Sequence, residues 1–263
     1  MKAILAGHDV IEFGWCVATW IPAVRHKARK YEQVVIVCKP SHRYLYQDFA
    51  TDFINFDKKG RTGLYGWYFR DKQIKMPLRF KTAHPDSKTY VPSKYMCTKA
   101  KRKYFKYGTF DEVLKYDIVI HARSEAKFGR GNRNWSPARY GRLLKKLRLD
   151  KELSVCSIGT FAGAYHIKGT EDKRDIEMEE LCNLLASSRL CIGVSSGPMH
   201  LASLCGCPHV VWTDNKYQKS IKGTNRDRYG TKWNPFNTEV QVIDNEGWTP
   251  RVDTVYEVVK GMV

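Results

Sequence analysis

The feature that most constrains the fold of this chain is a regular alternation of strand-like and helix-like segments between residues 117 and 212. Short apolar runs predict strands, and apolar residues at helical spacing predict helices between them. The predicted strands are Asp117–His121, Leu153–Ile158, Leu190–Val194 and Pro208–Trp212, and the predicted helices are Pro137–Leu147, opened by Ser136 at its cap, Ile176–Ser188 and Pro198–Cys205. Such alternation is typical of parallel sheets covered by helices, so this half is predicted to be an α/β domain.

The first part of the chain repeats this pattern on a smaller scale. Lys2–Ala6 predicts a buried strand, Trp20–Tyr31 a helix and Val34–Cys38 a second strand. The pattern fades into a loop-rich insertion at 60–108 and into a polar connection at 216–237. We therefore expect an α/β fold of two doubly wound domains, 1–114 and 115–263, ending in a helix at Val252–Met262.

The charge of the chain indicates an anionic partner. Its formal net charge is +18, and a field of that sign attracts nucleic acid, nucleotide diphosphates or anionic lipid. Lys and Arg are concentrated between Arg70 and Lys106, where they alternate with Tyr and Phe. This mixture neutralises phosphates while offering rings for stacking, so the segment is predicted to be a binding surface.

The sequence also bounds the compartment. It contains no run of ~18 to 20 apolar residues, and Met1–Val10 lacks the basic start and long apolar run of a signal peptide. The eight cysteines fall mostly in apolar runs, and nothing near Cys205 and Cys207 completes a zinc site. We expect reduced thiols and a cytoplasmic protein without a membrane span, in the host cytoplasm if the chain is viral.

One strand-to-helix turn carries an anion-binding pattern, Ser195-Ser196-Gly197-Pro198-Met199-His200. Backbone N–H groups converge at the start of a helix, serine hydroxyls add donors, and glycine permits a close approach of the ligand. His200, one turn into the helix, is placed to face the same ligand. A diphosphate is the natural occupant of such a turn.

The residues around this turn resemble the donor-binding segment of the ADP-heptose lipopolysaccharide heptosyltransferases. The likeness spans Leu190–Trp212 and extends to Ile118–Arg123 and to the Arg-Asn-Trp-Ser-Pro step at 133–137. It implies the GT-B fold of two Rossmann-like domains and an inverting transfer of a sugar from a nucleotide-diphosphate donor. Ser195 stands where the family has aspartate, which leaves the identity of the sugar open.

The resemblance implies a role for one further residue, and charge and position in the sequence suggest roles for others. Arg133 matches a basic residue near the phosphates in that family, and Arg123 or Lys168 would help to neutralise the leaving group. Tyr165 and His166, in the loop after Leu153–Ile158, are placed to contact a ribose or a base. The predicted donor-binding residues are Ser195, Ser196, Gly197, Pro198, Met199, His200, Arg123, Arg133, Thr160, Tyr165, His166 and Lys168.

A catalytic base is expected in the loop after the first strand, where the family is thought to place an aspartate. Glu12 is the first candidate, because Phe13 and Trp15 are placed to bury its carboxylate partly and raise its pKa, and Asp9 is the second. No Asp-x-Asp pair occurs to hold a divalent cation. We therefore expect a metal-independent transfer that needs no cofactor besides the nucleotide sugar.

The acceptor is argued from charge. A hydroxylated base in DNA is the first hypothesis, as for bacteriophage DNA-modifying glycosyltransferases, although no motif of those enzymes is present. Lipopolysaccharide core or another anionic glycan is the alternative, and a non-catalytic nucleic-acid-binding Rossmann protein is the third reading. The predicted acceptor-binding residues are Lys99, Lys101, Arg102, Lys103 and Tyr104.

Overall fold

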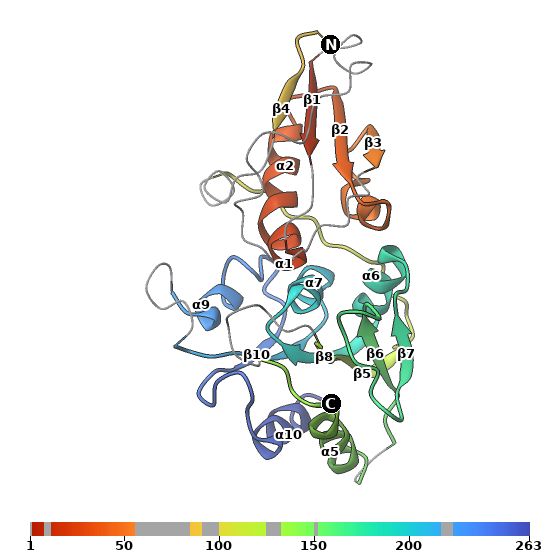
Figure 1. The fold of residues 1–263 in the computed structure, drawn as a ribbon, viewed down its shortest axis with the longest axis vertical. Coiled ribbons are helices and arrows are strands. Elements are labelled where there is room, and N and C mark those ends of the chain that lie inside the picture. Colours follow the sequence, from red (N-terminus) through yellow and green to blue (C-terminus); the bar gives the residue numbers. More distant parts are fainter. Residues whose placement is uncertain are drawn as a thin grey trace. The chain divides into compact units, whose positions relative to one another are not determined.

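The computed structural model describes residues 2–7, 12–55, 85–90, 100–124, 133–149, 152–216 and 223–263. The chain forms two compact units, Met1–Phe105 and Lys106–Val263, and Figure 1 shows the elements of each. Each unit contains a sheet whose strands all run parallel.

Residues 106–114, which the sequence assigned to the first domain, belong to the second unit. The sequence placed the division after Leu114, whereas the first unit ends at Phe105. The backbone N–H of Tyr107 donates to the carbonyl of Leu204 (3.0 Å), and the N–H of Asp111 donates to the hydroxyl of Ser187 (2.7 Å). These bonds attach the segment to the second unit.

The first unit is built on a four-stranded sheet in the order β3-β2-β1-β4. The strands are β1 (Ala3–Gly7), β2 (Gln33–Cys38), β3 (Asp52–Asn55) and β4 (Lys88–Tyr90), and the helices are α1 (Phe13–Trp15), a π-helix (Cys16–Trp20), α2 (Ile21–Ala28) and a 3₁₀-helix (Pro40–Tyr46). The predicted strand, helix, strand order of this unit is confirmed. The short edge strands β3 and β4 were not predicted.

An ion pair between the buried Arg25 and the partly exposed Asp48 fixes the end of this unit on α2. Arg25, which is 3% exposed, donates through Nε and Nη2 to both carboxylate oxygens of Asp48 (2.8 and 3.0 Å). Its Nη2 also donates to the carbonyl of Leu45 (3.1 Å), and its Nη1 donates to that of Lys103 (3.3 Å). The guanidinium therefore joins α2, the 3₁₀ segment and the last residues of the unit.

The second unit is built on a six-stranded sheet in the order β10-β9-β8-β5-β6-β7. Its strands are β5 (Tyr116–His121), β6 (Val155–Gly159), β7 (Glu171–Arg174), β8 (Ser188–Val194), β9 (His209–Trp212) and β10 (Val240–Ile243). The chain winds outward from β5 to β7, returns to β8 beside β5, and winds outward the other way. In such a doubly wound sheet, ligands bind beyond the carboxyl ends of the strands where the winding reverses, here β5 and β8.

Helices cover both faces of this sheet. They are α5 (Pro137–Leu147), α6 (Met178–Ala186), α7 (Gly197–Cys205), α9 (Asn225–Tyr229) and α10 (Val252–Lys260). In Figure 1, α5 and α10 pack together on one side of the sheet and α6 and α7 on the other. None of the helices in the described ranges is long and apolar enough to cross a membrane.

The core on the α5 and α10 side is aromatic. Trp135, Tyr140 and Trp212 are fully buried, and the rings of Trp135 and Trp212 have centroids 4.8 Å apart. The Trp135 indole N–H donates to the carbonyl of Pro250 (3.0 Å), so its polar atom is satisfied in the core. Ser136 is the N-cap residue of α5, as predicted, but its hydroxyl makes no capping bond.

The structure describes seven of the cysteines. They are Cys16, Cys38, Cys156, Cys182, Cys191, Cys205 and Cys207, and all are buried free thiols. Within the described part of the chain, no group of three or more His, Cys, Asp or Glu side chains is placed to hold a metal ion.

Candidate functional site

The predicted anion-binding turn lies where the sheet reverses its winding. Ser195 and Ser196 follow β8 directly, and His121 is the last residue of the adjacent strand β5, where it pairs in register with Gly193. The turn and His121 therefore meet at the carboxyl edge of the sheet, the edge at which doubly wound folds bind ligands.

Ser196 is the N-cap residue of α7, but its side chain does not cap the helix. Its backbone is extended (φ −159°, ψ 175°), and its hydroxyl lies 2.9 Å from Nδ1 of His121. The cap serine is thus held by an imidazole from the neighbouring strand rather than by the first-turn N–H groups. The positive end of the helix dipole lies at this turn, and Gly197 and Met199 belong to the first helical turn, whose N–H groups have no acceptor within the helix.

Two glycines make room for His121. A Cβ atom on Gly159 would lie 3.2 Å from the imidazole Cδ2, and one on Gly193 would lie 2.9 Å from the His121 carbonyl oxygen. The side chain is accordingly buried, at 5% exposure. Burial, together with the nearby charge of Arg123, lowers the pKa of His121 from 6.5 to about 3, so the imidazole is neutral at neutral pH.

His121 was predicted as the end of a strand and as part of the likeness at Ile118–Arg123, but not as a site residue. The available signal was a polar residue at the carboxyl end of an otherwise apolar strand. Its partner Ser196 lies 75 residues further along the chain, so the pair is visible only in the folded protein.

A second buried imidazole, that of His209 in β9, also has a lowered pKa. Its Nδ1–H donates to the carbonyl of Cys207 (3.0 Å), and its Nε2 lies 3.1 Å from the hydroxyl of Ser203. Burial lowers the pKa of His209 to about 4, although the bond to Cys207 opposes the shift.

We expect acid to destabilise the fold through these two imidazoles. Below pH 6.5 the unfolded chain binds a proton at each of them, whereas the folded protein does so only near pH 4 and pH 3. Each site then lowers the free energy of unfolding by about 1.4 kcal/mol per pH unit, or about 4 kcal/mol for both between pH 7.5 and pH 5. Urea unfolding at the two pH values measures this. His209→Gln should remove about half of the dependence, and an equal free energy at both pH values would contradict it.

The other residues of the turn are held by a segment that the sequence analysis did not recognise. The hydroxyl of Ser195 lies 3.2 Å from that of Tyr229, at the end of α9, and burial raises the pKa of Tyr229. The His200 ring is stacked on Tyr229 (centroids 5.3 Å apart, 25° between planes) and lies 4.4 Å from the ring of Trp233. Met199 is buried against Cys191 in the core.

α9 is anchored to the sheet by a chain of buried polar groups. Asn225 Nδ2 donates to Thr213, directly after β9 (2.6 Å), and its Oδ1 accepts from Arg228 Nη1 (2.7 Å). The Arg228 guanidinium also lies 5.2 Å from the Trp233 ring, and burial lowers its pKa. In the sheet, β9 and β5 lie on opposite sides of β8. These residues therefore support the turn from the β9 side, whereas His121 contacts it from the β5 side.

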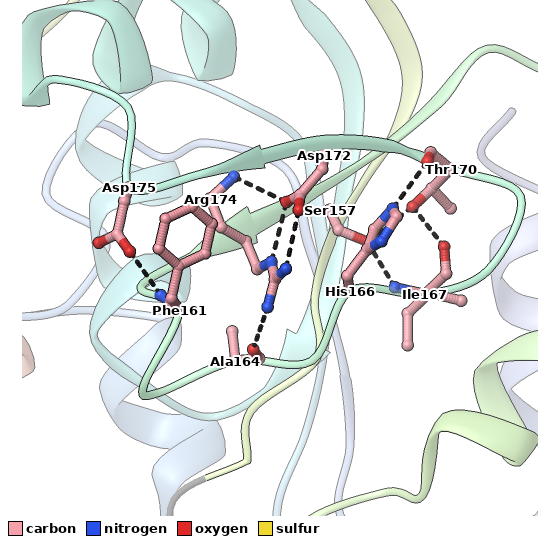
Figure 2. A network of polar contacts seen from close by, with 9 residues as sticks. All are labelled: Ser157, Phe161, Ala164, His166, Ile167, Thr170, Asp172, Arg174 and Asp175. Carbon is pink, nitrogen blue, oxygen red and sulfur yellow. Dashed lines mark hydrogen bonds and ion pairs between the residues drawn. The ribbon is translucent and has the colours of Figure 1, made fainter.

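The loop after β6 contains four of the predicted donor-binding residues. Thr160, Tyr165, His166 and Lys168 are all exposed. The Thr160 carbonyl accepts from the N–H of Ala164 (2.9 Å), and the Tyr165 N–H donates to the carbonyl of Ala122, the residue after His121 (2.7 Å). The loop is thereby attached to the end of β5, beside His121. Figure 2 shows the imidazole of His166 turned toward the backbone carbonyl of Thr170, 2.9 Å from its Nε2.

The two predicted arginines are both buried. Arg123, 8% exposed, follows β5 and forms a β-bridge with Ala164 of that loop. Arg133, 7% exposed, places its guanidinium 4.3 Å from the centroid of the Trp248 ring. Arg133 is therefore an internal cation of the second unit rather than a surface arginine ahead of α5.

The predicted catalytic and acceptor residues belong to the first unit. Glu12 follows the loop after β1 and is the N-cap residue of α1. It is exposed, so the expectation that its aromatic neighbours partly bury it is wrong: the Phe13 ring pairs with His42 instead. Asp9 lies outside the described residues.

The predicted acceptor-binding residues that the structure describes lie beside α2, where the N–H of Lys103 donates to the carbonyl of Pro22 (2.9 Å). Lys101 and Lys103 are exposed and Arg102 is half-buried. The hydroxyl of Tyr104 donates to the carbonyl of Ala18 in the π-helix (3.2 Å), which attaches this ring to the unit. Lys99 lies outside the described residues, as does most of the basic segment.

Comparisons with known proteins identify the fold. No family model and no curated protein matches the sequence. Among solved structures, the E. coli ADP-heptose lps heptosyltransferase II is 13% identical with a TM-score of 0.61, and the alignment covers 100% of this chain and 98% of that one. The E. coli heptosyltransferase WaaC with ADP is 10% identical with a TM-score of 0.55, covering 100% of both chains.

A third structure agrees with these two. The glycosyl transferase family 9 protein from Veillonella parvula is 10% identical, with a TM-score of 0.54, and covers 99% of this chain and 91% of that one. At such identities the likeness establishes the fold. The chain thus has the α/β fold with two Rossmann-like units that the sequence predicted, and these neighbours include members of the family that its turn resembles.

Proposed function

We propose that this protein is a glycosyltransferase that moves a sugar from a nucleotide-diphosphate donor to a hydroxyl group. The observation that carries the proposal is the turn at 195–200, placed at the reversal point of a doubly wound sheet with its cap serine held by His121. The fold shared with heptosyltransferases, one of them solved with ADP, supports the same reading.

The diphosphate of the donor binds at the start of α7. The Nδ1–H of the neutral His121 donates to Ser196, whose hydroxyl then donates to a phosphate oxygen, and the first-turn N–H groups add donors. Arg123 and Arg133 supply positive charge from the same unit. Ser195 brings no carboxylate to the sugar, and its hydroxyl lies 3.2 Å from that of Tyr229.

The transfer is a single displacement. A carboxylate, Glu12 in our assignment with Asp9 as the second candidate, takes the proton of the acceptor hydroxyl. The acceptor oxygen forms a bond to the anomeric carbon while the bond to the phosphate oxygen breaks, so the configuration inverts and a nucleoside diphosphate leaves. The arginines and the helix N–H groups neutralise the leaving charge without a metal ion.

The acceptor is a hydroxyl on a polyanion. A hydroxylated base in DNA is the proposed substrate, and it rests on the charge of +18 and on the basic segment that includes Lys101, Arg102 and Lys103. An anionic glycan is equally compatible with that charge, and a neighbour in fold is named for lipopolysaccharide. Acceptors of both kinds are therefore offered in the test.

Incubation with a panel of nucleotide sugars tests the proposal, with hydroxymethylated DNA and lipopolysaccharide core offered in parallel. We expect a mass gain of one sugar on one of the two acceptors. Gain on DNA supports the base as the acceptor, and gain on the glycan alone replaces it with the heptosyltransferase-like alternative. Failure of every nucleotide sugar to bind would instead favour a non-catalytic nucleic-acid-binding protein.

A further inference from the structure

An exposed aromatic ring stands on a rigid support beside the anion-binding turn. Phe161, in the loop after β6, is 65% exposed although it is a large apolar side chain. The guanidinium of Arg174 lies 5.0 Å from the centroid of its ring, and Figure 2 shows the two side by side. A ring supported by a cation and otherwise open to solvent is suited to stacking with a planar ligand.

The support for the ring is fixed by several hydrogen bonds. Arg174 donates through Nε and Nη2 to the carboxylate of Asp172 (2.8 and 2.7 Å) and through Nη1 to the carbonyl of Ala164 (3.1 Å). All three bonds are drawn in Figure 2. The guanidinium is therefore locked in place by the strand and by the loop, and it does not need to reorganise when a ligand arrives.

The backbone N–H of Phe161 is held by a residue whose own backbone conformation is unusual. Asp175 has a φ of 57°, in the left-handed region that non-glycine residues rarely adopt. Its carboxylate accepts from the N–H of Phe161 (2.7 Å), and its own N–H donates to the carbonyl of Gly159 (2.8 Å). Such strain persists where the surroundings enforce it, and it concentrates at ligand sites.

This support is continuous with the anion-binding turn. Gly159 separates them: a Cβ atom there would lie 2.6 Å from the Ala164 side chain and 3.2 Å from the imidazole of His121. Ala164 contacts the Arg174 guanidinium, and His121 contacts Ser196. A ligand whose phosphates lie at Ser196 would thus extend over β5 and β6 toward the ring, as a nucleotide does from its phosphates to its base.

We propose that the nucleobase of the sugar donor stacks on Phe161, with Arg174 as the group that holds this ring in position. This proposal rests on the proposed function, because it takes the diphosphate at Ser196 as its starting point. It names the part of the donor bound by the loop after β6, for which the sequence offered Tyr165 and His166 as contacts to ribose or base.

The test compares a diphosphate without a nucleoside with three nucleoside diphosphates. Inorganic pyrophosphate and the nucleoside diphosphates ADP, UDP and GDP are titrated calorimetrically into the wild type, Phe161→Ala, Phe161→Trp and Ser196→Ala. Phe161→Ala should weaken the best nucleoside diphosphate about tenfold and leave pyrophosphate unchanged, whereas Phe161→Trp should retain both. Ser196→Ala should weaken both ligands.

Phe110→Ala is the matched control. Phe110 is 61% exposed in the same unit. The N–H of the next residue, Asp111, donates to Ser187, which precedes the amino end of β8, whereas the anion-binding turn follows the carboxyl end of that strand. Equal nucleotide affinity in Phe161→Ala and the wild type, with Ser196→Ala still weakened, would overturn the stacking proposal alone. Equal loss of pyrophosphate in Phe161→Ala would also overturn it. A wild type that binds neither ligand would overturn the proposed function itself.

Discussion

Replacing Glu12 by glutamine is expected to lower kcat about 10²- to 10⁴-fold while leaving donor affinity unchanged, because the amide cannot accept the proton of the acceptor hydroxyl. The substitution keeps the shape of the side chain. It also preserves the local fold, since α1 is held by the backbone carbonyl of residue 12, which accepts from the N–H groups of Trp15 (2.8 Å) and Cys16 (3.0 Å). Rates of sugar transfer at saturating donor measure the effect.

Glu32→Gln is the control for this prediction, because Glu32 is another exposed carboxylate of the first unit and its variant should keep full activity. A Glu12→Gln enzyme with wild-type kcat would remove Glu12 from the mechanism. Asp9→Asn would then be expected to lower the rate, since Asp9 is the second candidate that the sequence offers for the base.

Replacing Arg25 by methionine is expected to lower the free energy of unfolding by about 3 kcal/mol. The change removes a buried guanidinium that donates to both carboxylate oxygens of Asp48 and to the carbonyls of Leu45 and Lys103, and it leaves these acceptors without their donor. Urea unfolding followed by circular dichroism measures the loss.

Two further variants show whether the stability loss of Arg25→Met comes from the broken ion pair. Arg29→Met removes an exposed arginine just after α2 and should change the free energy by less than about 0.5 kcal/mol. Arg25→Met with Asp48→Leu should recover part of the stability, because the second change removes the unpaired carboxylate. If Arg25→Met were as stable as Arg29→Met, the ion pair would not hold this unit together.

The sequence predicted the elements whose own residues determine them. β8 and α7 follow from an apolar run, a glycine and a proline, and the turn between them is a contiguous motif. β7 was missed because its four residues, Glu-Asp-Lys-Arg, are all charged, which is tolerated at the edge of a sheet but gives no strand pattern. α9 was missed because it has only five residues, and its Thr224–Asp227 capping box was the one available signal.

The site was less predictable than the fold, because its partners are far apart in the chain. The contact between His121 and Ser196 depends on the pairing of β5 with β8. The burial of His200 depends on rings at 229 and 233, in the segment read as a polar connection. A local pattern can place a residue at the end of a strand, but the sheet order decides which residue it meets there.

Whether the turn at 195–200 binds the diphosphate of a sugar donor is tested most directly by the affinity of the protein for nucleoside diphosphates. Isothermal titration measures this affinity for the wild type, Ser196→Ala and Ser154→Ala. Ser154 lies ahead of the amino end of β6, where its hydroxyl is bonded to Asp117, so it controls for the loss of a serine away from the turn. We expect at least one nucleoside diphosphate to bind, and Ser196→Ala alone to weaken its binding by about tenfold or more, which is the value of a hydrogen bond to a charged group. Absence of binding, or equal affinity in all three proteins, would contradict the claim that this turn holds the diphosphate of a sugar donor.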